Sequence, residues 1–157
     1  RSAKPDDPAD PLRPGDVVVV DRLGDQRHAC WGGGVTVAAK AAGALAGVVD
    51  GPCTDLAEIK SSDFPIWARG ISPITTRLYN LGGGLNIPVS CGGVAVLPGD
   101  VVLADESGVL VLHREEAEAI AREALRRQAN GAEREAAVRR GAKLGDLTGA
   151  SAKVLAA

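Results

Sequence analysis

The sequence contains no methionine, and it begins at Arg1. A translated chain starts with methionine, so we expect that residues were removed or that the sequence starts partway into a longer protein. Long apolar runs are missing as well. No stretch approaches the ~20 residues that a transmembrane helix needs, which excludes such a helix within this sequence.

Aromatic residues and excess positive charge are also scarce. Aromatics make up 3% of the chain, and the formal net charge is -2 at pH 7. An acidic balance argues against a surface that binds nucleic acid directly. Residues 1–14 are rich in proline and acids but lack the apolar segment of a signal peptide. Because 45% of the 157 residues are hydrophobic, the composition still suits one folded domain and excludes wholesale disorder.

Cysteine is rare, and its spacing matches neither a disulfide framework nor a structural zinc site. The three cysteines are Cys30, Cys53 and Cys91, and none belongs to a CxxC pair. This argues against a disulfide framework and a structural zinc site, and it favours a reducing, cytoplasmic location. Cys53 has no base nearby in sequence, so we interpret it as a small core residue. His28 and His113 have no partner at ligand spacing and are interpreted as structural or solvated.

Short apolar runs and helical segments alternate in the first half of the chain. Four valines, Val17–Val20, lie between turn residues and predict a buried strand. A glycine-opened, alanine-rich segment then predicts a helix that ends at Gly43. The expected strands are 17–21, 46–51 and 64–68, and the expected helices are 35–42 and 55–61. This alternation predicts βαβ units with a parallel sheet.

The second half has a different pattern. Short strands at 87–90, 94–96, 101–104 and 108–112, separated by Gly, Pro and Asp turns, predict an antiparallel meander. From residue 115 to 140 charges follow helical spacing, which predicts helices with a solvated charged face and a break at Asn130-Gly131. Residues 142–157 are expected to form a weakly ordered tail.

Three consecutive glycines precede the first predicted helix. At Gly32, Gly33 and Gly34 the backbone amides are accessible, and the helix start adds partial positive charge. Together with Val35, these amides can bind a carboxylate or phosphate. The alternative is a flexible turn without a ligand. The sequence lacks the P-loop pattern and the dinucleotide fingerprint, which excludes those two phosphate sites.

Two acids follow the second predicted strand, at the edge where parallel sheets bind ligands. Asp55 and Glu58 are three residues apart at a helix start, so they share one face. Such a pair can hold Mg²⁺ with several waters left on the ion. The alternative is a capping box with no metal. Arg69, near the end of the third strand, can add a contact to an anion.

These segments, in this order, resemble the RraA-like family between about Arg13 and Leu112. That family includes the metal-dependent pyruvate aldolases for 4-hydroxy-4-methyl-2-oxoglutarate and 4-carboxy-4-hydroxy-2-oxoadipate, and the regulator that binds ribonuclease E. The residues that carry the resemblance are Pro14-Gly15-Asp16-Val17-Val18-Val19-Val20-Asp21, Trp31-Gly32, Ala38-Ala39-Lys40, Gly43, Gly47-Val48-Val49-Asp50-Gly51, Asp55, Arg69-Gly70, Ser72-Pro73, Pro88-Val89, Gly92-Gly93-Val94, Pro98-Gly99-Asp100, Ala104-Asp105 and Gly108-Val109.

The resemblance implies an α/β/β sandwich related to the swivelling phosphohistidine domain, followed here by C-terminal helices. It also implies a homotrimer or a dimer of trimers, with sites between subunits. We expect a linker or remnant of an N-terminal portion at 1–13, the core at 14–113, helices at 114–141 and the tail at 142–157. The sequence is accordingly expected to be the C-terminal two-thirds of a longer protein.

The resemblance also assigns roles to the site residues. The aldolase signature has an acid, twenty residues, Arg-Asp, two residues and a closing acid. Asp55 matches the metal-binding Asp and Glu58 the closing acid, which implies Mg²⁺ or Mn²⁺ as cofactor. Thr54 stands where the family has its substrate-binding Arg, and Gly33 stands where it has the first acid. Loss of one donor to a developing enolate typically costs ~10²–10³ in rate, so the two departures bear directly on activity.

Three functions are compatible with this pattern. The first is a metal-dependent lyase, of the pyruvate aldolase or 2-oxoacid decarboxylase type, acting on a small hydroxy or oxo carboxylic acid. Asp55 and Thr54 would then be catalytic, and Gly32 to Val35 with Arg69 would bind substrate. The second is a non-catalytic binding protein like the ribonuclease regulator. The third is a hydratase or isomerase on the same scaffold, since Gly33 enlarges the pocket.

Overall fold

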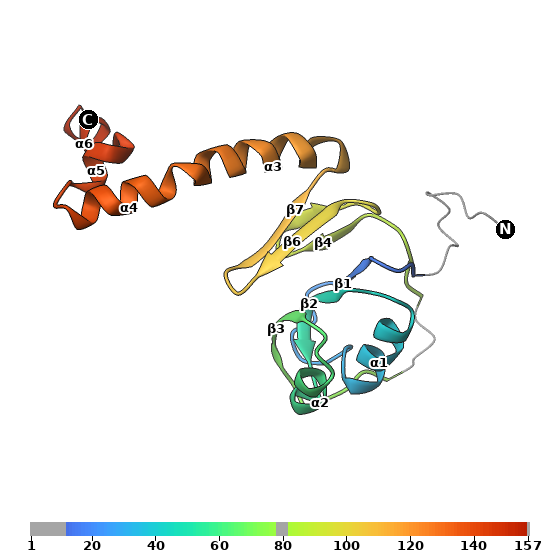
Figure 1. The fold of residues 1–157 in the computed structure, drawn as a ribbon. Helices are drawn as coiled ribbons and strands as arrows, with labels where there is room; N and C mark the ends of the chain where they lie inside the picture. Colours follow the sequence, from blue (N-terminus) through green and yellow to red (C-terminus); the bar gives the residue numbers. More distant parts are fainter. Residues whose placement is uncertain (1–11, 78–81, 157) are drawn as a thin grey trace. The chain divides into compact units, whose positions relative to one another are not determined.

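The structure is a computed structural model that describes residues 12–77 and 82–156. The chain divides between His113 and Arg114 into two compact units, and each is described by itself (Figure 1). Most of the linker expected at 1–13 lies outside the described residues. Among the helices of the described part, none is long and apolar enough to cross a membrane.

A parallel sheet forms the centre of the first unit. Its strands are β1 (Val17–Asp21), β2 (Ala46–Cys53) and β3 (Ile66–Ile71), in the order β1-β2-β3. The connections contain α1 (Gly33–Ala41) and α2 (Leu56–Ser61), which confirms the predicted βαβ units. β3 begins two residues later than expected, because Phe64 packs in the core and Pro65 has no amide hydrogen for the ladder. β2 continues past Gly51 through a register shift between Val49 and Pro52.

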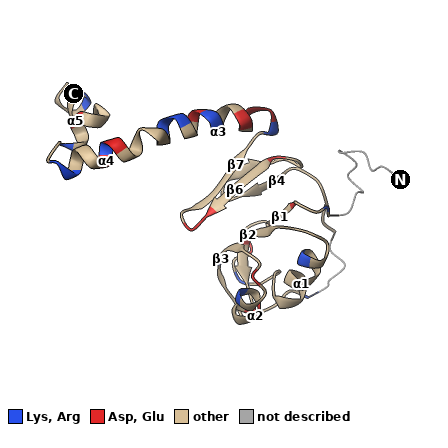
Figure 2. Ribbon diagram, in the orientation of Figure 1, with Lys and Arg blue, Asp and Glu red and all other residues tan. Residues whose placement is uncertain are grey.

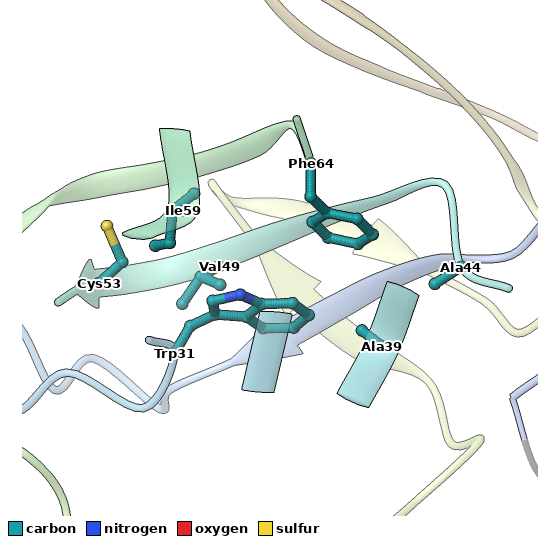
Figure 3. Packing of buried hydrophobic residues seen from close by; sticks show 7 residues of the cluster. All are labelled: Trp31, Ala39, Ala44, Val49, Cys53, Ile59 and Phe64. Carbon is teal, nitrogen blue, oxygen red and sulfur yellow. The ribbon is translucent and has the colours of Figure 1, made fainter. Parts of the chain in front are cut away.

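The main hydrophobic core lies between this sheet and its two helices (Figure 3). Trp31 and Phe64 stack with ring centroids 6.2 Å apart and an interplanar angle of 14°. Cys53 is buried in this cluster, as the sequence predicted, and all three cysteines are free thiols. The full cluster consists of Trp31, Ala39, Ala44, Val49, Cys53, Ile59 and Phe64.

Two β-hairpins cover the other face of the sheet (Figure 1). The first pairs β4 (Val89–Cys91) with β5 (Val94–Val96), and the second pairs β6 (Val101–Asp105) with β7 (Gly108–Leu112). Asp21, at the end of β1, accepts a hydrogen bond from the Ser90 amide (3.1 Å). Asp50, within β2, accepts one from the Gly92 amide (2.9 Å). Helices, parallel sheet and hairpins thus form the α/β/β layers expected.

The predicted single meander is wrong, because the hairpins are separate two-stranded sheets. Between them, the amide of Leu97 donates to the Asp100 carboxylate (2.9 Å), and the Asp100 amide donates back to the Leu97 carbonyl (3.1 Å). This closed turn reverses the chain at Pro98-Gly99. β6 therefore pairs with β7 instead of continuing the ladder of β5.

The second unit is helical, with α3 (Arg114–Ala129), α4 (Gly131–Arg139), α5 (Leu144–Thr148) and α6 (Ala150–Leu155). The break at Asn130-Gly131 is confirmed. Acidic and basic residues alternate along α3 and α4 (Figure 2), and none of the described residues of these helices is buried. The weakly ordered tail expected from residue 142 is wrong for its described part, which forms α5 and α6 around Gly149 in a left-handed conformation (φ 75°).

Candidate functional site

The glycine turn before α1 is anchored in the core. Thr36, one turn into the helix, is 0% exposed. Its hydroxyl accepts a hydrogen bond from the Trp31 indole (2.9 Å) and donates one to the Gly32 carbonyl (2.9 Å). The Thr36 amide donates to the same carbonyl (3.0 Å). These bonds fix the backbone from Trp31 to the helix start, so the interpretation as a flexible turn is not supported.

Asp55 follows β2 and begins α2, but its side chain does not cap that helix. Its backbone is left-handed (φ 55°, ψ 41°), a conformation that Asp tolerates better than most residues but still at a cost. Oδ2 instead accepts a hydrogen bond from the Gly33 amide (3.0 Å), and Oδ1 accepts one from the Thr54 hydroxyl (3.3 Å). The capping-box interpretation is therefore wrong: the carboxylate is turned from its own helix towards the start of α1.

The exposed Glu58 side chain reaches the same turn from the first turn of α2. A methyl group at Gly33 would overlap the Glu58 carboxylate, and one at Gly32 would lie 2.5 Å from Asp55 Oδ2. The carboxylates of both acids thus lie close to the backbone of this turn, and they can do so because Gly32 and Gly33 have no side chains. The expectation that Gly33 enlarges the pocket is wrong, since the Glu58 carboxylate occupies the space that a side chain there would fill.

The donor set of this turn fits a hard divalent cation that keeps water ligands. Asp55 and Glu58 are both exposed, and Mg²⁺ is usually held by one or two carboxylates together with waters. Among the described residues, no group of three or more His, Cys, Asp or Glu side chains could hold a metal. An Mg²⁺ or Mn²⁺ ion here would therefore rely on these two acids and on oxygen ligands from solvent or substrate.

The remaining predicted site residues are distributed unevenly. Gly34 and Val35 lie in the exposed first turn of α1, where amides have no acceptor within the helix. Thr54 lies beside Asp55 and offers a neutral hydroxyl at the position where the resemblance implies an arginine. Sequence reasoning missed Thr36. The available signal was a polar residue within an otherwise apolar helix, five positions after a tryptophan.

Arg69 does not join this group. Its guanidinium pairs with Asp50, and this bond, aided by the Gly92 amide, lowers the pKa of the Asp50 carboxyl. Both residues line a cavity of about 340 Å³ between the parallel sheet and the hairpins, whereas neither Asp55 nor Glu58 lines it. Within the residues that the structure describes, Arg69 is thus committed to joining β2 and β3, not to the glycine turn.

Comparison with known proteins places these features in a family. The family model described as Aldolase/RraA matches residues 5–111. A protein of Halalkalibacterium halodurans named "Putative 4-hydroxy-4-methyl-2-oxoglutarate aldolase" is 38% identical over 125 residues. The aligned region covers 80% of this chain and 59% of the length of the relative. The chain thus spans less than two-thirds of the length of this curated relative.

Two solved structures share the fold. Streptomyces coelicolor RraAS2, described as an unusual member of the RNase ES inhibitor RraA family, is 31% identical with a TM-score of 0.68, covering 75% of this chain and 60% of its own. The RNA-processing inhibitor RraA from Thermus thermophilis is 33% identical with a TM-score of 0.59, covering 64% and 61%. With the layered fold and a family match over most of the chain, this protein belongs to the RraA-like family.

Proposed function

We propose that the protein is a metal-dependent carbon–carbon lyase, of the pyruvate aldolase or 2-oxoacid decarboxylase type, acting on a small hydroxy or oxo carboxylic acid. One observation carries this proposal. The Asp55 carboxylate does not cap its own helix; it accepts a hydrogen bond from the Gly33 amide instead. The Glu58 carboxylate lies at the same turn. An Asp at the N-cap position usually accepts a hydrogen bond from an amide of its own helix, so the orientation of Asp55 towards Gly33 departs from the capping pattern.

The chemistry proposed for this turn divides between the cation and the chain. A bound Mg²⁺ or Mn²⁺ would supply Lewis-acid stabilisation of the enolate that C–C cleavage leaves behind. Asp55 and Glu58 would hold the ion, and the exposed amides of Gly34 and Val35 would bind a substrate carboxylate at the start of α1. The Gly33 amide is already engaged by Asp55 and is unavailable for that role.

Thr54 makes this a weaker electrophilic site than the family signature. Its hydroxyl can donate one hydrogen bond, but it carries no charge to offset a developing enolate. We propose that a cationic side chain of a neighbouring subunit compensates, within a homotrimer or dimer of trimers in the cytoplasm. Without such a cation, we expect turnover ~10²–10³ below that of a site with the arginine.

The test measures pyruvate release from 4-hydroxy-4-methyl-2-oxoglutarate, and decarboxylation of oxaloacetate, with and without Mg²⁺ or Mn²⁺. Turnover should require the metal and disappear in Asp55→Asn. Asp63→Asn is the matched control, because Asp63 is also exposed and has a left-handed backbone (φ 51°) but lies outside the turn. Absence of metal-dependent turnover with both substrates would refute the lyase proposal.

A second function is favoured by the missing arginine and by the inhibitor relatives of 31% and 33% identity. It is a non-catalytic regulator that binds a ribonuclease of the E class. In that case the protein should slow RNA cleavage by ribonuclease E, and Asp55→Asn should leave the inhibition unchanged. No effect on cleavage and no stable complex with the nuclease would exclude this alternative.

A further inference from the structure

Gly33 contacts both acids of the turn in different ways. Its amide donates to Asp55 Oδ2 (3.0 Å), and its missing side chain leaves room for Glu58. A Cβ atom at Gly33 would overlap Glu58 Oε2 and would lie 3.0 Å from Cδ and 3.2 Å from Cβ of the same residue. The three nearest atoms thus all belong to Glu58, so the steric effect of a side chain at 33 falls first on that residue.

The neighbouring glycine provides a contrast. Gly34 is exposed, and a Cβ added there would meet nothing within 4 Å. Both glycines belong to the first turn of α1, and neither has a positive φ. A methyl group at either position is therefore compatible with the helical backbone, and only the one at Gly33 would displace a carboxylate.

We infer that Gly33 positions Glu58: the absence of a side chain at 33 lets the acid from α2 place its carboxylate above the start of α1, in the space that a side chain at 33 would fill. This inference rests on the proposed function, since it makes Glu58 the second carboxylate of the cation site. The position is electrostatically favourable, because the start of a helix attracts negative charge. Within the described part of the chain, Glu58 has no ion-pair partner that would draw its side chain elsewhere.

Gly33 is one of the two departures from the family signature, and it bears on where Glu58 lies. A side chain at 33 would force the Glu58 carboxylate out of its present position, because the two need the same space. Relative to the family signature, the chain lacks the first acid and keeps the closing acid, Glu58, whose carboxylate occupies the space left free at Gly33. Gly33 is a positioning residue in this scheme, because it acts only through Glu58 and Asp55.

The experiment compares Mn²⁺ affinity, measured by titration calorimetry and by the electron paramagnetic resonance signal of free Mn²⁺. The variants are Gly33→Ala, Gly34→Ala, Glu58→Gln and the double variant of Gly33→Ala with Glu58→Gln, with circular dichroism to check the fold. Gly33→Ala and Glu58→Gln should each weaken Mn²⁺ binding about tenfold. Gly34→Ala should bind Mn²⁺ like the unmodified protein, because it keeps the backbone amide assigned to the substrate and its Cβ meets nothing within 4 Å. The double variant should bind no more weakly than Glu58→Gln, because both changes remove the same interaction.

Equal Mn²⁺ affinity in Gly33→Ala and Gly34→Ala would overturn the inference, and so would additive losses in the double variant. Asp55→Asn separates this result from failure of the proposed function. If Asp55→Asn leaves Mn²⁺ binding unchanged, or the unmodified protein binds none, the cation site itself is refuted. If Asp55→Asn abolishes binding while Gly33→Ala does not weaken it, only the role of Gly33 is refuted.

Discussion

Replacement of Thr36 by valine tests how the glycine turn is anchored. Valine keeps the branched shape and nearly the volume of threonine, but it removes a hydroxyl that is both donor and acceptor. The Trp31 indole N–H would lose its acceptor in a place where water cannot replace it, since Trp31 is 2% exposed and Thr36 is 0% exposed. A buried donor without a partner costs about 1–3 kcal/mol.

The second lost bond costs less. The Gly32 carbonyl would keep the hydrogen bond from the Thr36 amide (3.0 Å), so it would remain satisfied. Loss of an additional bond to a satisfied group is worth about 0.5–1 kcal/mol, partly offset because valine buries no polar atom. We therefore expect Thr36→Val to lower the free energy of unfolding by about 2 kcal/mol.

Urea denaturation followed by tryptophan fluorescence is the appropriate assay, because Trp31 and Trp67 both lie in the first unit. With a typical slope of 1–3 kcal/mol per M urea, the midpoint should fall by about 1 M. Thr36→Ser should recover most of the loss, because it restores the hydroxyl. Thr76→Val, at an exposed position, is the control and should change stability by less than about 0.5 kcal/mol. A similarly small change in Thr36→Val would refute the anchoring argument.

Three further predictions follow from other contacts. Hydrogen bonds from the amides of Arg27 and His28 lower the pKa of Asp25 from 3.8 to about 2. The Asp25 carboxylate therefore stabilises the fold above pH 4, and its contribution is lost as the pH falls towards 2. Urea midpoints at pH 5 and pH 2.5 should differ less in Asp25→Asn than in the unmodified protein. Gly43→Ala should destabilise by more than about 1 kcal/mol, because φ is +89° and a Cβ would lie 2.9 Å from Pro14 Cα, whereas Gly15→Ala (φ +97°) meets nothing and should cost less in the same assay. Mn²⁺ at 100 times its dissociation constant should add about 2.7 kcal/mol to stability, visible as a raised melting temperature that is absent in Asp55→Asn.

The sequence predicted those parts of the fold that local pattern controls. The valine run at 17–20 and the glycine before and after α1 were enough for the parallel βαβ arrangement. The hairpins were found as strands, but their separation was not, because it depends on hydrogen bonds around Asp100 that spacing does not reveal. The helices after residue 142 were missed, since short helices of this kind have weak periodicity.

The candidate site shows the same division between local and tertiary information. Asp55 and Glu58 were identified from spacing, but spacing alone favours the capping box. The left-handed backbone and the bond to the Gly33 amide, 22 positions away, decide between these interpretations, and both depend on packing of α2 against α1. Arg69 was predicted to contact an anionic ligand because it lies near the end of the third strand. Its actual partner, Asp50, is 19 positions away on a neighbouring strand, and spacing does not reveal that contact.

The β6–β7 hairpin has a consequence for how the protein behaves at high concentration. Its outer face presents Val101, Leu103 and Leu110 to solvent, and Leu103 is 64% exposed. Within the sheets of the described residues, β6 and β7 pair only with each other, so each strand leaves one edge of backbone donors and acceptors unpaired. Apolar edge strands of this kind join strands of other chains and promote aggregation. A single lysine at Leu103 is therefore the simplest change for improving solubility without touching the glycine turn.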